Sequence, residues 1–148
     1  NPEKYIPMVI KKVRDNEIVT VHANREKTVA GSRHYIHAED VAEALLFLYH
    51  YDVGSMKADE TGAKCQKFNI VGADEINNLE LAQFIAKIQN KELKYEMVDF
   101  HSQRPGHDLR YALNGSKMEA MGWSPQSAFD RLQSTVEWTL NNPGWLSI

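Results

Sequence analysis

Segments with strand-like and helix-like residue patterns alternate along the whole chain, and this alternation constrains the fold more than any single motif. The segment EIVTVHA (17–23) alternates in polarity and is rich in β-branched residues, which is typical of a strand. The last long segment, 127–142, places Leu132, Val136 and Leu140 on one face of a helix. Strands that alternate with helices predict an α/β fold.

The same patterns predict the approximate bounds of the individual elements. We expect helices over residues 2–13, 39–51, 79–90, 116–122 and 127–142. We expect strands over residues 17–23, 33–37, 66–72, 94–100 and 110–113. Pro7 falls inside the first helix, so this helix either kinks there or begins later than residue 2. The body of the second helix, 41–51, is apolar nearly all round, which predicts a buried helix.

Composition limits the class of protein. The chain has 148 residues, of which 43% are hydrophobic and 25% charged, as in a soluble globular domain. Its formal net charge of −3 gives no electrostatic support to nucleic-acid binding. No apolar stretch approaches the roughly 18 residues that a membrane span needs, so we expect no membrane partner. The lone Cys65 excludes an internal disulfide and a cysteine-based zinc site, and it fits a cytoplasmic location.

The start of the sequence suggests a piece of a longer protein, because the first residue is Asn1 and no methionine precedes it. The chain contains no G-x-G-x-x-G and no Walker motif, so it lacks the usual glycine-rich cradle for a dinucleotide.

A basic turn lies at QRPGHDLR, where Arg104, His107 and Arg110 surround a Pro-Gly pair. Arg104 could contact a phosphate through two parallel hydrogen bonds, and the turn would fix its direction, while His107 and Arg110 could add donors. The alternative is a surface loop whose charges are simply solvated. The turn alone does not decide between these interpretations.

Other polar residues are equally ambiguous when taken singly. Arg33 opens a strand that leads into the apolar helix, where it is either a ligand contact or a surface arginine. Asn78 is best explained as the N-cap of the helix 79–90, a position that also favours anions. His34 and His37, three apart on a strand, point to opposite faces, which argues against a metal site. Ser32 has no base and orienting group that would make it a nucleophile.

The order of motifs along the chain resembles one enzyme family. PEKYIP, SRHYIHAEDVAEALLFL, FNIVGADEINNLELAQFIAKI, RPGHDLRYALNGSKMEAMGWSP and TVEWTLNNPGWL follow one another as in the C-terminal half of nucleotide-sugar 4,6-dehydratases. The resemblance is greatest to dTDP-glucose 4,6-dehydratases, which belong to the extended short-chain dehydrogenase/reductase family together with the nucleotide-sugar epimerases. The run R-P-G-H-D-x-R-Y-A and the segment G-W-x-P-x-x-x-F are the parts most specific to the dehydratases.

The resemblance implies a cytoplasmic, homodimeric, NAD-dependent lyase that forms a 4-keto-6-deoxy sugar nucleotide. It implies that residues 1–148 are the C-terminal substrate-binding lobe, while a Rossmann domain upstream holds NAD and the catalytic residues. No catalytic residue is then expected in this chain. Residues 39–71 are expected to supply a helix and a strand that complete the Rossmann domain. Alone, the chain would expose the apolar face of residues 41–51.

Substrate contacts of the family match individual positions of this sequence. Lys4 matches a lysine near the nucleotide of a nucleoside-diphosphate sugar, and Arg33 matches an arginine that contacts its diphosphate. Asn78 matches an asparagine that contacts the same ligand. Arg104 and His107 match the contacts that R-P-G-H makes with the diphosphate end.

The part of the site that would hold the base departs from the family pattern. Thr20, Val21 and His22 occupy the place of a Pro-Ile-Tyr strand along the base, and they are expected to line the nucleoside. His22 replaces an aromatic residue there, and the connection NREKTVAGS (24–32) is longer than the usual one, so the nucleotide is left open. Outside this part of the site, RHYIHAED (33–40) replaces R-D-W-L-Y-V-E-D. Two rival functions remain: a nucleotide-sugar 4-epimerase, and a non-catalytic module that binds nucleotide sugars or another protein.

Overall fold

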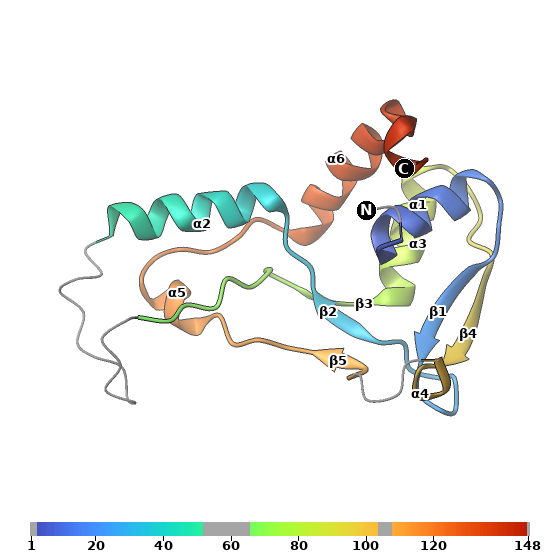
Figure 1. Ribbon diagram of the computed structural model, residues 1–148, viewed down its shortest axis with the longest axis horizontal. Helices are drawn as coiled ribbons and strands as arrows, with labels where there is room; N and C mark the ends of the chain where they lie inside the picture. Colours follow the sequence, from blue (N-terminus) through green and yellow to red (C-terminus); the bar gives the residue numbers. More distant parts are fainter. Residues whose placement is uncertain (1–2, 52–65, 104–107, 148) are drawn as a thin grey trace.

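The computed structural model describes residues 3–51, 66–103 and 108–147 (Figure 1). The described residues form a mixed α/β structure with a larger body at one end and an arm at the other. The body contains the helices α1 (Tyr5–Arg14), α3 (Asn78–Ile88) and α6 (Ala128–Asn141) beside the strands β1 (Val19–Ala23) and β4 (Tyr95–Asp99). The chain alternates between helices and strands, as its pattern predicts.

The first helix begins later than residue 2, which is one of the two outcomes expected from its proline. Helix α1 begins at Tyr5, so Pro7 lies in the first turn. Backbone N–H groups in the first turn of a helix have no intrahelical partner, and the missing N–H of proline therefore costs nothing there.

Two small sheets position the rest of the fold. Strands β1 and β4 pair in parallel, with Val19 opposite Tyr95. Strand β2 (Ser32–His34) lies between β3 (Glu75–Asn77), which is antiparallel to it, and β5 (Arg110–Tyr111), which is parallel. Because β5 begins at Arg110, the last residue of QRPGHDLR, this sheet places the end of the basic turn beside β2.

The main hydrophobic core lies where α1, α3, α6 and β1 meet. Its fully buried members include Ile10 of α1, Val21 of β1, Ile85 of α3 and Val136 of α6. Each such side chain contributes about 1.5–3 kcal/mol by leaving water. The body of the molecule is thus held by residues from four elements that are distant in sequence.

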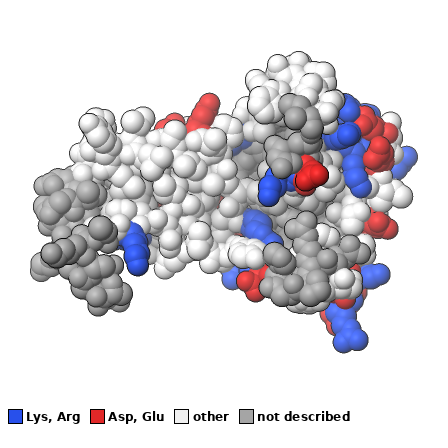
Figure 2. Space-filling view, viewed as in Figure 1, with Lys and Arg blue, Asp and Glu red and all other residues white. Residues whose placement is uncertain are grey.

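A second, smaller cluster holds the arm, which consists of α2 (Ala38–His50), α5 (Ser116–Ala120) and the extended segment 66–72. Ala44, Met118 and Trp123 are its buried residues. The prediction that the helix body 41–51 is buried is wrong for this chain, because Leu46 and Tyr49 are 60% and 82% exposed. The apolar face is exposed instead, as expected for the chain alone, and this end of the molecule is largely uncharged in Figure 2.

Two local predictions are corrected by the structure. Residues 66–72 form no strand, because none of the described strands pairs with their backbone. The Asn69 side chain instead donates to the Asn114 carbonyl at 3.0 Å. The predicted strand 94–100 ends one residue early. There the Asp99 carboxylate accepts a hydrogen bond from the His101 N–H at 3.1 Å, and a short helix, α4 (Phe100–Gln103), begins.

The chain ends in a 3₁₀ turn, η2 (Pro143–Leu146), whose Leu146 is buried in the main core. Among the described residues, no helix combines the length and the apolar character that crossing a membrane requires.

Candidate binding cavity

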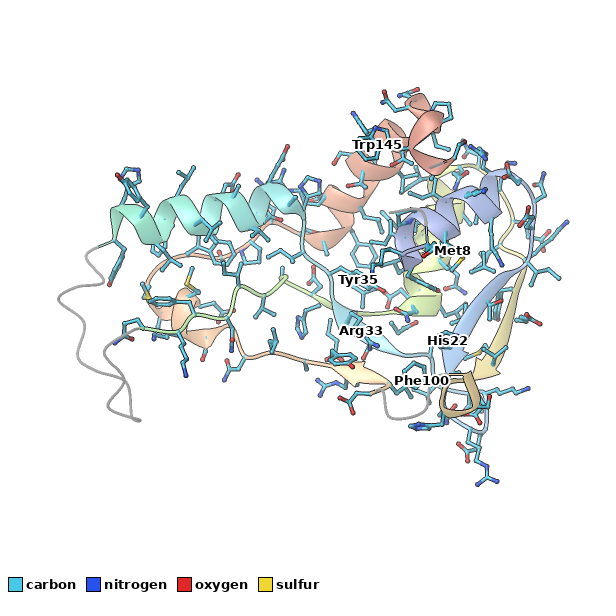
Figure 3. All side chains as sticks on the ribbon, in the orientation of Figure 1. Met8, His22, Arg33, Tyr35, Phe100 and Trp145 are labelled. Atoms are coloured by element: carbon cyan, nitrogen blue, oxygen red, sulfur yellow. The ribbon has the colours of Figure 1, made fainter. Side chains whose placement is uncertain are left out.

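A cavity of about 650 Å³ opens between the beginning of α1, β1, β2 and the beginning of α3. Figure 3 shows Arg33, Tyr35, His22 and Phe100 around this space, with Met8 on α1 above it. The residues that line it come from well-separated parts of the sequence: Glu3, Lys4, Tyr5, Ile6, Pro7, Met8, Thr20, His22, Gly31, Arg33, Tyr35, Asn78, Phe100 and Leu109.

The structure brings five of the sequence-predicted site residues to this one cavity: Lys4, Thr20, His22, Arg33 and Asn78. Lys4 is the exposed N-cap residue of α1, and its ammonium group has no partner within the described part of the chain.

Other predicted site residues are placed differently. Val21 does not line the cavity: successive residues of a strand face opposite sides, so Val21 points into the core while Thr20 and His22 face the cavity. Arg104 and His107 lie outside the described residues. Phe100 and Leu109, which line the cavity, stand on either side of that segment.

Arg33 uses much of its guanidinium to hold the neighbouring chain. Its Nη1 donates to the carbonyl oxygens of Ser32 at 2.5 Å and Leu109 at 2.7 Å, and Nη2 donates to that of Asp108 at 3.2 Å. The guanidinium also lies over the Tyr111 ring, 4.3 Å from its centroid. Arg33 therefore fixes residues 108–109, near the end of the basic turn, in addition to lining the cavity.

Asn78 is not the helix cap that the sequence predicts. The capping residue is Asn77, whose Oδ1 accepts a hydrogen bond from the Glu80 N–H at 2.8 Å. This leaves the Asn78 side chain available to the cavity. Its Oδ1 accepts from the Tyr35 hydroxyl at 2.6 Å, and its backbone oxygen accepts from the Tyr5 hydroxyl at 2.8 Å.

Both tyrosine hydroxyls are partly buried. Burial raises the pKa of Tyr35 to about 12. Burial, together with the neighbouring Tyr35, also raises the pKa of Tyr5. Both phenols therefore remain neutral hydrogen-bond donors near neutral pH.

A charged network beside the cavity ties the three-stranded sheet together. Glu75 of β3 accepts two hydrogen bonds from Arg110 of β5, each 2.6 Å, and one from the Ser32 hydroxyl of β2, also 2.6 Å. These hydrogen bonds lower the pKa of Glu75 to about 2. Arg110 is thus committed to Glu75 and is not a free donor for a phosphate.

The end of the cavity near β1 is lined by the rings of His22 and Phe100. The His22 ring meets the Phe100 ring edge-on, with centroids 5.6 Å apart. The Thr20 hydroxyl lies 3.3 Å from a Glu96 carboxylate oxygen on the paired strand β4. A flat, partly polar group would fit these surroundings better than an anion.

The two histidines weighed as metal ligands both contact backbone atoms. His34 Nδ1 lies 3.1 Å from the Gly72 carbonyl, and His37 Nδ1 accepts from the Glu39 N–H at 3.2 Å at the start of α2. Within the described ranges, no group of three or more His, Cys, Asp or Glu side chains is arranged to hold a metal ion.

Tyr5, Tyr35 and Gly31 are among the cavity residues that sequence reasoning missed. Tyr35 stands where the family pattern has tryptophan. This exchange of tryptophan for a residue with a hydroxyl group was the one sequence feature that could have drawn attention to Tyr35. Gly31 approaches the backbone of Leu109 so closely that a Cβ atom at Gly31 would lie 2.8 Å from the Leu109 oxygen. No local sequence pattern predicts this contact.

Comparison with known proteins finds dTDP-glucose 4,6-dehydratases among the proteins similar to this chain, although no protein-family model matches it. A dTDP-glucose 4,6-dehydratase from Escherichia coli is 32% identical over 155 residues, which cover 97% of this chain and 39% of the enzyme. The crystal structure of the dTDP-glucose 4,6-dehydratase from Streptomyces venezuelae with NAD and TYD bound is also similar. It has a TM-score of 0.75 and 28% identity, over 98% of this chain and 41% of that one.

An epimerase also has a similar fold. The UDP-glucuronic acid 4-epimerase from Bacillus cereus, in complex with UDP-glucuronic acid and NAD, has a TM-score of 0.69 at 15% identity, over 93% of this chain and 38% of that one. Identity this low shows the fold alone. In each of these comparisons, the chain spans about two fifths of the length of the protein that it matches.

Proposed function

Because the chain is homologous to the dTDP-glucose 4,6-dehydratases, we propose that it is the C-terminal, substrate-binding part of an NAD-dependent nucleotide-sugar 4,6-dehydratase. The observation that carries this proposal is the cavity that gathers Lys4, Arg33 and Asn78 beside the first turn of α3. Two cationic side chains and an amide next to the positive end of a helix suit a diphosphate.

Each part of the cavity has a distinct role in this proposal. Lys4 supplies a mobile positive charge, and the Asn78 amide supplies a fixed donor. Arg33 holds residues 108–109, which brings the end of the basic turn to the cavity. The strand face formed by Thr20 and His22 takes the nucleoside, and Arg104 and His107 of the turn contact the diphosphate.

The described residues do not fit an NAD site. None of the described strands runs through a glycine-rich turn into a helix, which is the arrangement that holds a dinucleotide pyrophosphate. NAD and the groups that oxidise C4, eliminate water and return the hydride would therefore lie on a part of the enzyme outside these 148 residues. This chain binds and orients the nucleotide sugar.

Titration calorimetry with dTDP, UDP and thymidine tests the binding role. We expect a nucleoside diphosphate to bind and thymidine, which lacks the diphosphate, to bind far more weakly. Asn78→Ala should weaken binding by about 1–3 kcal/mol, because a hydrogen bond to a charged group is lost. Asn141→Ala is the matched control, since Asn141 is exposed at the end of α6, away from the cavity. Equal affinity for dTDP and thymidine would contradict the proposal.

The rival functions differ in their products. With NAD and dTDP-glucose, the natural protein that carries this sequence should release a 4-keto-6-deoxy sugar nucleotide. Release of the 4-epimer instead would identify an epimerase, whose fold is shared. Tight binding with no turnover of any nucleotide sugar would favour a non-catalytic binding module. Residues 1–148 alone are expected to give no turnover.

A further inference from the structure

Two tyrosine hydroxyls from different elements converge on one asparagine at the edge of the cavity. Tyr35 is the residue just after β2, and its hydroxyl donates to the Asn78 Oδ1 atom at 2.6 Å. The Tyr5 hydroxyl, in the first turn of α1, donates to the backbone oxygen of the same residue at 2.8 Å. The Asn78 N–H in turn donates to the Gly31 carbonyl at 2.8 Å. Side chain and backbone of Asn78 are thus held from three sides.

These contacts leave one polar atom of Asn78 unused. Its Nδ2 atom has no hydrogen-bond partner among the described residues, and it lies beside Gly31, where a Cβ atom would come within 3.6 Å of it. No side-chain nitrogen or oxygen in the described part of the chain is both buried and without a partner. The Nδ2 atom is therefore accessible, and the space beside it is the cavity that Asn78 and Gly31 both line.

We propose that Tyr35 and Tyr5 are positioning residues that fix the Asn78 side-chain amide with its Nδ2 atom, and not its Oδ1 atom, toward the cavity. An asparagine amide can present either a donor or an acceptor to a ligand, depending on how it is turned. An anionic ligand needs the donor. Because the Tyr35 hydroxyl donates to Oδ1, the amide is held in the orientation that presents Nδ2, its donor, to the ligand.

The geometry supports this orientation of the amide. The 2.6 Å contact falls in the range of O–H···O hydrogen bonds, whereas N–H···O bonds are usually about 2.7–3.2 Å long. The raised pKa values of both tyrosines keep each hydroxyl protonated and able to donate. Tyr5 adds a second constraint, because its hydrogen bond anchors the backbone at the residue whose side chain Tyr35 orients.

The role of the fixed Nδ2 atom in binding a diphosphate rests on the proposed function. A preorganised donor loses less entropy when a ligand binds than one that must first be ordered. Removal of the Tyr35 hydroxyl should therefore weaken binding even though the Nδ2 donor itself is retained.

Nuclear magnetic resonance of the Asn78 side-chain NH₂ group tests the positioning directly, without a ligand. In the unaltered protein we expect a distinct pair of Nδ2 proton signals. In Tyr35→Phe this pair should move toward the values of solvent-exposed asparagines. Tyr95→Phe is the matched control, because Tyr95 is exposed on β4 and does not line the cavity. Unchanged Asn78 signals in Tyr35→Phe would overturn the proposal.

Calorimetry with dTDP then separates this proposal from the proposed function. We expect Tyr35→Phe to weaken dTDP roughly 2- to 10-fold, the loss of one ordinary hydrogen bond, and to have little further effect once Asn78 is alanine. Independent, multiplying effects of the two substitutions would overturn the positioning role. If the Asn78 signals respond but dTDP does not bind the unaltered protein, the proposed function fails and the positioning stands.

A second variant covers the possibility that Tyr35→Phe disturbs folding, which the backbone spectrum would reveal. Asn78→Asp keeps an oxygen for the Tyr35 hydroxyl but replaces the Nδ2 donor by an acceptor. We expect it to fold and to weaken dTDP at least as much as Asn78→Ala. An aspartate variant that binds dTDP as well as the unaltered protein would show that Nδ2 does not face the ligand, and would overturn the proposal.

Discussion

Alanine substitution at three glycines should destabilise the protein in a definite order. At Gly72, a Cβ atom would lie 2.0 Å from the carbonyl oxygen and 2.7 Å from the carbonyl carbon of Tyr35. At Gly31, a Cβ atom would lie 2.8 Å from the carbonyl oxygen of Leu109. At Gly144, it would meet nothing within 4 Å. The expected order of destabilisation is therefore Gly72→Ala, then Gly31→Ala, then Gly144→Ala.

The size of each effect follows from how far the backbone must move. Both opposing groups are backbone atoms, which cannot rotate away as a side chain can. Gly72→Ala must separate segment 66–72 from the end of β2 by roughly 1–1.5 Å, so we expect at least the upper end of the about 1–3 kcal/mol that overpacking costs. Gly31→Ala needs a shift of roughly half an ångström and should cost about 1–2 kcal/mol. Gly144→Ala should stay within about 0.5 kcal/mol.

Urea unfolding followed by circular dichroism measures these differences as shifts of the midpoint at constant slope. Gly31→Ala should also weaken dTDP, because the Leu109 oxygen that must move accepts hydrogen bonds from Arg33 and from the Ser32 N–H. A Gly72→Ala variant as stable as Gly144→Ala would refute the packing of segment 66–72 against β2. It would also refute the reasoning that places Tyr35.

Three further predictions concern ionisable groups. Because the pKa of Tyr35 rises from 10.0 to about 12, its contribution to stability is complete below pH 10 and is lost as the pH rises through 12. In an ultraviolet titration, Tyr35→Phe should therefore show one fewer tyrosine that ionises well above pH 10. Ionisation of all tyrosines near pH 10 in the unaltered protein would contradict this. Because the pKa of Glu75 falls from 4.5 to about 2, its contribution to stability is complete above pH 4.5 and is lost as the pH falls toward 2. Glu75→Gln should therefore flatten the dependence of the unfolding free energy on pH between those values. An unchanged pH dependence would count against the contact between Glu75 and Arg110. Arg104→Ala should weaken dTDP in calorimetry by about 1.5–3 kcal/mol, and unchanged affinity would return the basic turn to the surface-loop interpretation.

The sequence predicts the elements well where the pattern is long. Helices α1, α2, α3 and α6 lie within a few residues of their expected bounds, because the apolar stripe of each is set by local spacing. Strand 66–72 fails for the opposite reason. Its residues have strand propensity, but a strand also needs a partner, and local propensity does not specify one.

The site divides in the same way. Lys4, Arg33 and Asn78 were found from the order of motifs, and the structure places all three at one cavity. Which of two adjacent asparagines caps α3 could not be predicted, because both residue types are identical and only the backbone conformation selects Asn77. The contact between Tyr35 and Asn78 joins residues 43 positions apart and depends on how β2 lies against α3. Such contacts follow from tertiary packing alone.

The central claim is that the cavity between α1, β1, β2 and α3 binds a nucleoside diphosphate. A titration of the isotopically labelled protein with dTDP, followed by the backbone amide signals, tests it most directly. The account predicts saturable shifts concentrated at Gly31, Arg33 and Asn78, with smaller changes on α6. Shifts that do not saturate, or that gather on the outer face of α3 and α6 around Phe84 and Phe129, would contradict it.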